Sequence, residues 1–219
     1  MSPTLAWALV STRLPSQGNN SAPIVAETTT AAADKLRESA NLAMDRYADG
    51  DESAFSELYD VLAPRLYRYL LRQTREAAGA EDLLQQTFLK LHASRARFLR
   101  GGDVLPWAFA IARRLFIDGY RRHQRAAARS DAPPPSEPSV EGAEQLLQAK
   151  RAALELDREL QRLPEAQRVV FELMRQDGLS LREVAEVLGT TTNAVKLRAH
   201  RAHVALRLAL HDDADRFGE

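Results

Sequence analysis

A stretch near the carboxyl end of this chain constrains its fold most, because it predicts two helices joined by a tight turn. Residues 180–208 have the sequence SLREVAEVLGTTTNAVKLRAHRAHVALRL. Ser180 and Glu183 have the spacing of a capping box, which marks the start of a helix. Gly189 ends that helix, since a sharp turn needs a residue that tolerates a positive φ. Residues 190–192 then supply the turn and the cap of a second helix, so the stretch predicts a helix-turn-helix.

The second helix of this pair has one apolar face and one basic face. Its apolar residues recur at i, i+4, i+7 and i+11, the spacing of a buried helical face: Val195, Ala199, Ala202 and Leu206. No acidic residue occurs between positions 192 and 210, and Lys196, His200 and Arg201 fall on the other face. A cationic helix that follows a tight turn fits the major groove of DNA. A helical hairpin with a merely solvated basic face is the alternative, and the agreement of cap, turn and charge favours DNA binding.

The charged residues of the chain are segregated, although its formal net charge is zero. Residues 95–129 contain nine arginines against Asp103 and Asp118, a local balance of +7. Residues 131–165 contain eight acids against four bases, a local balance of −4. Because attraction to phosphate acts within a Debye length of about 8 Å, such blocks matter more than the sum. Two basic surfaces separated by an acidic connector predict a protein that holds nucleic acid at two places.

The sequence contains no constellation typical of an enzyme or a metal protein. It has no cysteine, and its five histidines form no metal-ligand pattern. A helical nuclease would need clustered acids or histidines, so we expect no catalytic residue, no metal and no cofactor. The apolar run at residues 5–10 is too short to span a membrane and has no basic flank before it. We therefore expect a cytoplasmic protein.

The fold class that the sequence predicts is all-α, with two small helical domains joined by a proline-rich linker, because no stretch alternates like a strand. Residues 1–44, rich in Ser, Thr, Ala and Pro, are expected to be a flexible N-terminal extension. The first helical domain then covers residues 45–124. Four prolines within six residues indicate a linker at residues 125–143. The helix-turn-helix domain covers residues 144–211, and a tail follows at residues 212–219.

Three helices are predicted in the first domain. The first has an apolar stripe over residues 55–70 and is interrupted by Pro64, which is expected to kink or split it. The second covers residues 77–92, and the third begins near Pro106. The expected inward residues of the third helix recur every four positions: Trp107, Ile111 and Leu115.

The third helix also carries aromatic and basic residues in mixed order. Trp107 and Tyr120 are interleaved with four arginines: Arg113, Arg114, Arg121 and Arg122. Aromatic faces with arginines between them suit single-stranded nucleic acid, whose bases stack and whose phosphates accept guanidinium groups. For Trp107 a place in the core is the favoured alternative. For the arginines DNA binding is favoured, because so many basic residues need a counter-charge.

Three phrases of the sequence carry a resemblance to a known family. The phrases AEDLLQQTFLKLH at residues 80–92 and LPWAFAIARRLFIDGYRR at residues 105–122 resemble the first domain of an extracytoplasmic-function (ECF) sigma factor. The phrase LQRLPEAQRVVFELMRQDGLSLREVAEVLGTTTNAVKLRAHRA at residues 160–202 resembles its second domain. The match covers residues 50–124 and 144–208, in the family's order. It implies a dissociable specificity subunit of bacterial RNA polymerase, which directs the core enzyme to promoters and assists their melting.

The resemblance also implies roles for particular residues. Asp82, Gln85 and Gln86 form a polar patch early in the second helix, to which the residues alone give no function. The helix that carries this patch and Phe88 would dock on the coiled coil of the polymerase's largest subunit. The loop at residues 95–103 and the third helix would melt and hold the −10 element: Arg97, Arg100, Trp107, Arg113, Arg114, Asp118, Arg121 and Arg122. The helix that begins at Thr192 would bind the −35 element, with these residues nearest the base edges: Asn193, Lys196 and His200. Arg198 and Arg201 would hold phosphates, which position a protein without specifying sequence.

The partners that the resemblance implies are core RNA polymerase, promoter DNA and an anti-sigma factor. Polymerase contact would use the coiled coil and also the flap of the second-largest subunit, with no small-molecule substrate and no membrane insertion. The chain departs from the family's usual pattern at three places on the second helix of the helix-turn-helix. Asn193 and Ala194 replace a Gly-Thr pair, Leu197 replaces a serine and His203 replaces an arginine. The −35 sequence therefore cannot be transferred from relatives.

A stand-alone helix-turn-helix regulator that binds operator DNA is the alternative function. It explains the second domain, but it leaves the basic helix and the polar patch of the first domain without a task. Such a regulator usually binds a two-fold site as a dimer. The sequence contains nothing that resembles a coiled-coil dimerisation seam.

Overall fold

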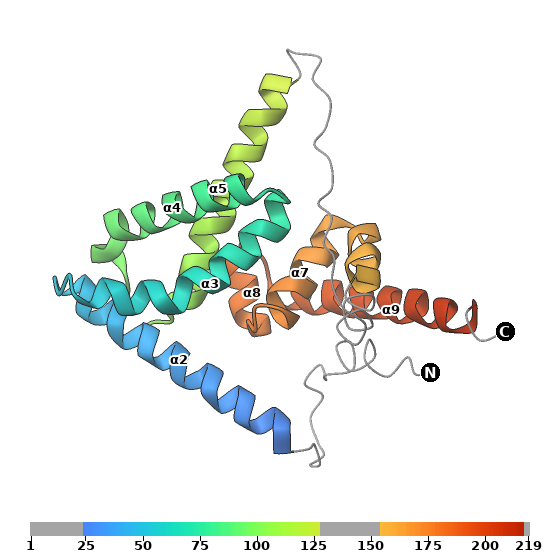
Figure 1. Ribbon diagram of the computed structural model, residues 1–219, viewed down its shortest axis with the longest axis horizontal. Coiled ribbons are helices and arrows are strands. Elements are labelled where there is room, and N and C mark those ends of the chain that lie inside the picture. The colour runs from blue at the N-terminus through green and yellow to red at the C-terminus, as the bar shows by residue number, and fades with distance from the viewer. Residues whose placement is uncertain (1–23, 128–153, 217–219) are drawn as a thin grey trace, which may run out of the picture. The chain divides into compact units, whose positions relative to one another are not determined.

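The structure of the chain is a computed structural model, which describes residues 24–127 and 154–216 (Figure 1). Its labelled helices are α2 (Ile24–Ala48), α3 (Ala54–Thr74), α4 (Ala77–Ser94), the short 3-10 helix η1 (Arg95–Arg97), α5 (Val104–Ala127), α7 (Glu165–Arg175), α8 (Leu181–Leu188) and α9 (Thr192–Arg216). Residues 154–162 form a further, unlabelled helix. No strand occurs in the described residues, so the all-α prediction is confirmed.

The chain divides into two compact units, and each has an apolar core. One unit contains α2, α3, α4, η1 and α5. The other contains residues 154–162, α7, the beginning of α8, and α9. The first unit therefore carries the basic aromatic helix, and the second carries the cationic helix of the helix-turn-helix.

Helix α2 is an element that the sequence prediction missed. Its buried residues recur at i, i+3, i+4 and i+7, and they lie on one face: Ala40, Ala43, Met44 and Tyr47. The helix packs on α3 and α5. The predicted extension at residues 1–44 is therefore wrong for residues 24–44, because a face half made of alanines allows close packing without large apolar side chains. Residues 1–23 of that prediction lie outside the described part of the chain.

Helix α3 crosses Pro64 without ending. It is one element from Ala54 to Thr74, so a split at Pro64 is wrong. The proline is exposed, and its ring therefore displaces no packed neighbour. Buried residues on the other side hold both halves of the helix in one core: Leu58, Leu62, Leu66, Tyr69 and Leu70.

Helix α5 buries a different face from the one expected. Trp107, Ile111 and Leu115 are only half-buried. The fully buried residues are Val104, Leu105, Ala108, Phe109 and Ala112. Because α5 packs on α2, α3 and α4 together, its buried face includes small residues that a search for large apolar side chains overlooks. The Phe109 ring meets the Tyr69 ring edge-on, with centroids 5.3 Å apart.

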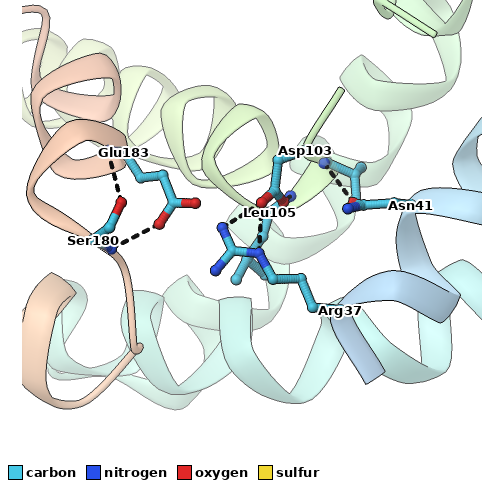
Figure 2. A network of polar contacts seen from close by, with 7 residues as sticks. Arg37, Asn41, Asp103, Leu105, Ser180 and Glu183 are labelled. Atoms are coloured by element: carbon cyan, nitrogen blue, oxygen red, sulfur yellow. Dashed lines mark hydrogen bonds and ion pairs between the residues drawn. The ribbon is translucent and has the colours of Figure 1, made fainter. Parts of the chain in front are cut away.

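The start and end of α8 follow the sequence prediction. The backbone N–H of Ser180 donates to Glu183 Oε2 at 2.7 Å, and the backbone N–H of Glu183 donates to Ser180 Oγ at 3.4 Å (Figure 2). Gly189 follows the helix with a φ of +60°. The N–H of Thr190 then donates to the carbonyl of Ala185 at 2.9 Å, which closes the last turn. The predicted capping box and the predicted glycine stop are both confirmed.

The apolar face predicted for α9 lies in the core of the second unit. Its four residues are all buried: Val195, Ala199, Ala202 and Leu206. One cluster joins Ala202 and Leu206 to residues from the helix at 154–162, from the connection after it and from α7: Leu156, Leu160, Leu163 and Phe171. Burying this face against α7 leaves the opposite face of α9 as the surface of the unit.

Two further predicted boundaries move. Helix α5 continues to Ala127, so a linker that starts at residue 125 starts too early. Helix α9 continues to Arg216, so most of the predicted tail is helical. Residues 128–153 and 217–219 lie outside the described part of the chain. Within the described ranges, no helix is long and apolar enough to cross a membrane.

Candidate nucleic-acid interface

Helix α9 presents most of its predicted DNA-binding residues on the surface. The exposed members are Thr192, Asn193, Lys196, His200 and Arg201, whereas Arg198 is half-buried. The hydroxyl of Thr191 accepts a hydrogen bond from the N–H of Ala194 at 3.2 Å, which caps the helix. The positive end of the helix dipole and the basic side chains therefore lie on the same surface, which favours phosphate.

His203 lies on α9 at the edge of this surface and is half-buried. Burial lowers the pKa of the imidazole below its ordinary value of 6.5, and the neighbouring charges of Arg175, Arg207 and His200 lower it further. The ring is therefore neutral at pH 7. The cationic character of α9 comes from its lysine and arginines rather than from this histidine.

The basic side of α5 is open to solvent. Arg114, Arg121 and Arg122 are exposed, and Arg122 Nε donates to the backbone carbonyl of Asp118 at 3.3 Å. Arg113 differs, because its Nη1 atom is buried and has no hydrogen-bond partner within the described residues. Three of the four predicted arginines are thus free of the core, while the fourth is partly turned into it.

Aromatic rings accompany these arginines. Tyr120 is exposed, and its ring stacks on that of Phe116 with centroids 6.2 Å apart. Trp107 is half-buried against the buried ring of Phe98, at 5.2 Å between centroids. Trp107 therefore contributes to the core and also keeps part of its ring accessible.

The loop before α5 carries two of the predicted DNA-binding residues. Arg97 is exposed in η1. Arg100 is also exposed, and its guanidinium pairs with the carboxylate of Asp49 on α2. Leu99, between them, has 79% of its surface exposed. The tip of the loop thus combines two basic groups with a solvent-exposed apolar side chain.

The predicted polymerase-docking patch lies on α4. Asp82 and Gln85 are exposed, and the amide of Gln86 donates to Asp82 Oδ2 at 2.6 Å. Phe88 is almost fully buried, so it does not belong to the same exposed patch. Its ring contacts that of Tyr59 on α3, with centroids 4.7 Å apart.

A groove of about 750 Å³ adjoins this patch and was not predicted. Its lining comes from α2, α4, and the chain from residue 52 into α3: Tyr47, Glu52, Phe55, Tyr59, Glu81, Leu84, Gln85, Phe88, Leu89 and His92. The Tyr47 hydroxyl shares a hydrogen bond with His92 Nδ1, and the Arg95 guanidinium lies 5.6 Å from the Tyr47 ring centroid. Leu89 is 62% exposed at the groove. The sequence contained a signal for this groove, because Leu89 is an apolar residue next to Phe88 on the outward side of a helix.

Within the described residues, no group of three or more His, Asp or Glu side chains could hold a metal ion. The described residues instead form basic, aromatic and apolar surfaces. Surfaces of this kind suit the binding of nucleic acid and protein.

Comparisons with known proteins identify both units. The family description "Sigma-70 region 2" matches residues 58–126, and "Sigma-70, region 4" matches residues 153–206. The RNA polymerase sigma factor CarQ of Myxococcus xanthus is 36% identical over 168 residues, which are 75% of this chain and 93% of that protein. The ECF RNA polymerase sigma factor SigF of Caulobacter vibrioides is 35% identical over 162 residues, 74% of this chain and 88% of that protein.

A solved structure has a similar fold. It is that of the sigma factor RpoE of Bartonella quintana in complex with the anti-sigma factor NepR. The TM-score is 0.59 and the identity 25%, over 72% of this chain and 96% of the other.

Proposed function

The chain belongs to the ECF sigma factors of bacterial RNA polymerase, and from this membership we propose how its two units divide transcription initiation between them. As a sigma factor, it directs core polymerase to specific promoters and assists their melting. The observation that carries the division is the exposed basic side of α9 opposite a fully buried apolar side. A stand-alone regulator is not favoured, because the similar proteins are sigma factors that match both units.

The second unit contacts the −35 element as a duplex. Asn193, Lys196 and His200 lie at or near the start of α9, where a recognition helix meets base edges in the major groove. Arg201 and the half-buried Arg198 hold phosphates and position the helix. Exposed Leu197 adds an apolar contact of the kind that a thymine methyl group accepts.

The first unit holds the opened −10 strand. The exposed arginines of α5 neutralise the phosphates of that strand, and the exposed ring of Tyr120 offers a surface for base stacking. Trp107 joins this surface through the accessible part of its ring. Arg97 and Arg100 place positive charge at the loop, and exposed Asp118 lies on α5 between Arg114 and Arg121.

The exposed side of α4 and the neighbouring groove dock on core polymerase. Asp82, Gln85 and Gln86 supply polar contacts, while Leu89 and the aromatic floor of the groove supply apolar area. Phe88 lines the groove but is almost fully buried, so it acts mainly by supporting Tyr59. An apolar groove with a polar rim is the usual anatomy of a protein interface.

The partners in this proposal are core polymerase, promoter DNA and an anti-sigma factor. The contacts to polymerase are its largest-subunit coiled coil and the flap of its second-largest subunit. An anti-sigma partner is supported by the similar RpoE structure, which was solved with one. The chain performs no catalytic step of its own, and it acts in the cytoplasm, where polymerase works.

One reconstitution tests the proposal. The full chain is combined with bacterial core polymerase and genomic DNA fragments, and transcript start sites are mapped. Lys196→Glu is expected to reduce promoter-specific transcripts at least tenfold while leaving polymerase binding unchanged, because it reverses charge at the DNA face alone. Leu89→Asp is expected to weaken the complex with core polymerase, which is measured by size exclusion.

Glu155→Gln serves as a control, since it changes an exposed charge on a helix that carries neither proposed face. Promoter-specific transcripts that survive Lys196→Glu would contradict the α9 assignment. An unchanged complex with Leu89→Asp would contradict the groove assignment. Failure of the wild-type chain to form any polymerase complex would count against the whole scheme.

A further inference from the structure

Helix α2 carries a line of polar residues, and it ends before residue 58, where the region 2 match begins. Arg37, Asn41, Asp45 and Asp49 recur every four residues, so they lie in one row along the helix. Each of the four contacts a residue between positions 100 and 104, the segment that joins η1 to α5. Helix α2 therefore holds the loop that carries Arg100, and this loop leads into α5, the helix proposed to face DNA.

Two members of this row hold the start of α5. Asn41 Oδ1 accepts the backbone N–H of Val104 at 2.9 Å, so α2 caps a helix from which it is distant in sequence. Asp103 Oδ1 accepts the N–H of Leu105 at 3.0 Å, and Arg37 Nε donates to Asp103 Oδ2 at 2.5 Å (Figure 2). Side chains of α2 therefore stabilise the first turn of α5, Asn41 directly and Arg37 through Asp103.

The other two members hold the turn before it. Both carboxylate oxygens of Asp45 lie 3.2 Å from the backbone nitrogen of Gly101, and Asp49 pairs with Arg100. Gly101 has a φ of +69°, and the N–H of Gly102 donates to the carbonyl of Leu99 at 2.8 Å.

This turn has little freedom to change shape. A Cβ atom on Gly102 would lie 2.7 Å from the Leu99 carbonyl oxygen, so the turn accepts no side chain there. The turn presents Leu99 outward and is itself anchored to α2. Such an anchored turn loses little conformational entropy when it binds a strand.

We propose that Asn41 and Asp45 are positioning residues for promoter opening, because they hold this turn and the first turn of α5 in the conformation that meets the unpaired −10 strand. The inference rests on the proposed function of the first unit. Neither residue needs to touch DNA, since each acts through a backbone N–H of the DNA-facing segment. Their loss leaves the docking face on α4 intact.

The test uses the full chain with core polymerase on the strongest promoter recovered by the mapping described above. That promoter is prepared as a duplex and with its −10 region already unpaired. Opening is followed by the fluorescence of 2-aminopurine in the −10 strand, at saturating polymerase. Asp45→Ala and Asn41→Ala are each expected to slow opening of the duplex about tenfold, roughly the effect of losing one charge-assisted or capping hydrogen bond.

On the preopened template the same variants are expected to bind about tenfold more weakly than the wild type, because the released turn has to be ordered as it takes up the unpaired strand. Asp45→Asn keeps an acceptor oxygen for the Gly101 N–H and should restore most of the opening rate. Glu38→Gln, an exposed acid on α2 outside the row, is the matched control and should leave opening unchanged.

Wild-type binding of the preopened template by both alanine variants, weaker polymerase binding by Asp45→Ala, or no rescue by Asp45→Asn would overturn the positioning role. Arg121→Glu separates this outcome from failure of the proposed function. If that variant opens the promoter normally, the −10 assignment of the first unit is wrong, and the inference that rests on it falls with it.

Discussion

At the scale of single residues, His203 makes the second unit sensitive to acid. Its folded pKa lies below the ordinary 6.5, because of burial first and of Arg175, Arg207 and His200 next. Below pH 6.5 the unfolded chain therefore binds this proton more readily than the folded chain does. The stability that the neutral ring contributes is fully present above that pH and is lost as pH falls through the folded pKa.

We expect acidification from pH 7 to pH 5 to destabilise α9 in the wild type more than in His203→Gln. Hydrogen exchange of the α9 amides in the full chain, compared between the two proteins at each pH, measures the difference. Asn193→Gln alters an exposed, non-ionisable side chain on the same helix and serves as the control. Identical pH dependence in wild type and His203→Gln would show that the ring carries no such linkage.

At the scale of elements, the capping box decides how firmly α8 begins. Ser180→Ala removes the side-chain acceptor for the Glu183 N–H and is expected to cost about 1 kcal/mol of local stability. Glu183→Gln keeps an acceptor for the Ser180 N–H and is expected to cost less than half of that. Exchange rates of the α8 amides report both values. A larger loss from Glu183→Gln than from Ser180→Ala would reverse the assigned roles.

The sequence was sufficient where structure depends on local chemistry. The cap at Ser180, the stop at Gly189 and the buried row on α9 each depend on residues within a few turns of one another. Local rules therefore predicted the helix-turn-helix and the outward basic residues of α9. They also predicted the exposed arginines of α5, which are Arg114, Arg121 and Arg122.

The sequence was insufficient where several helices meet. Small residues such as Ala40 and Ala108 are buried because neighbouring helices approach closely, and no local pattern marks such an approach. The groove beside Leu89 needs three separated segments to form at all. The roles of Asn41 and Asp45 depend on contacts with residues about sixty positions away in the sequence, so no local pattern indicates them.

At the scale of the whole molecule, the proposed function gives the two units separate contributions to promoter affinity. Lys196 and Arg121 belong to different units, and each faces solvent. The effects of Lys196→Glu and Arg121→Glu on the affinity of the polymerase complex for its promoter are therefore expected to add within about 0.5 kcal/mol. Titration of the single and double variants against one promoter fragment checks this. A strong interaction energy would mean that the two units do not bind the promoter independently.

The row of contacts on α2 has a consequence for where this protein can be shortened. The recognisable sigma-70 segment begins at residue 58, whereas α2 ends at Ala48. A chain cut to the recognisable segment would keep every arginine of α5 and lose the external cap on Val104. A boundary set by sequence likeness would therefore separate the loop before α5 from the helix that holds it, while every residue of that loop would remain in the chain.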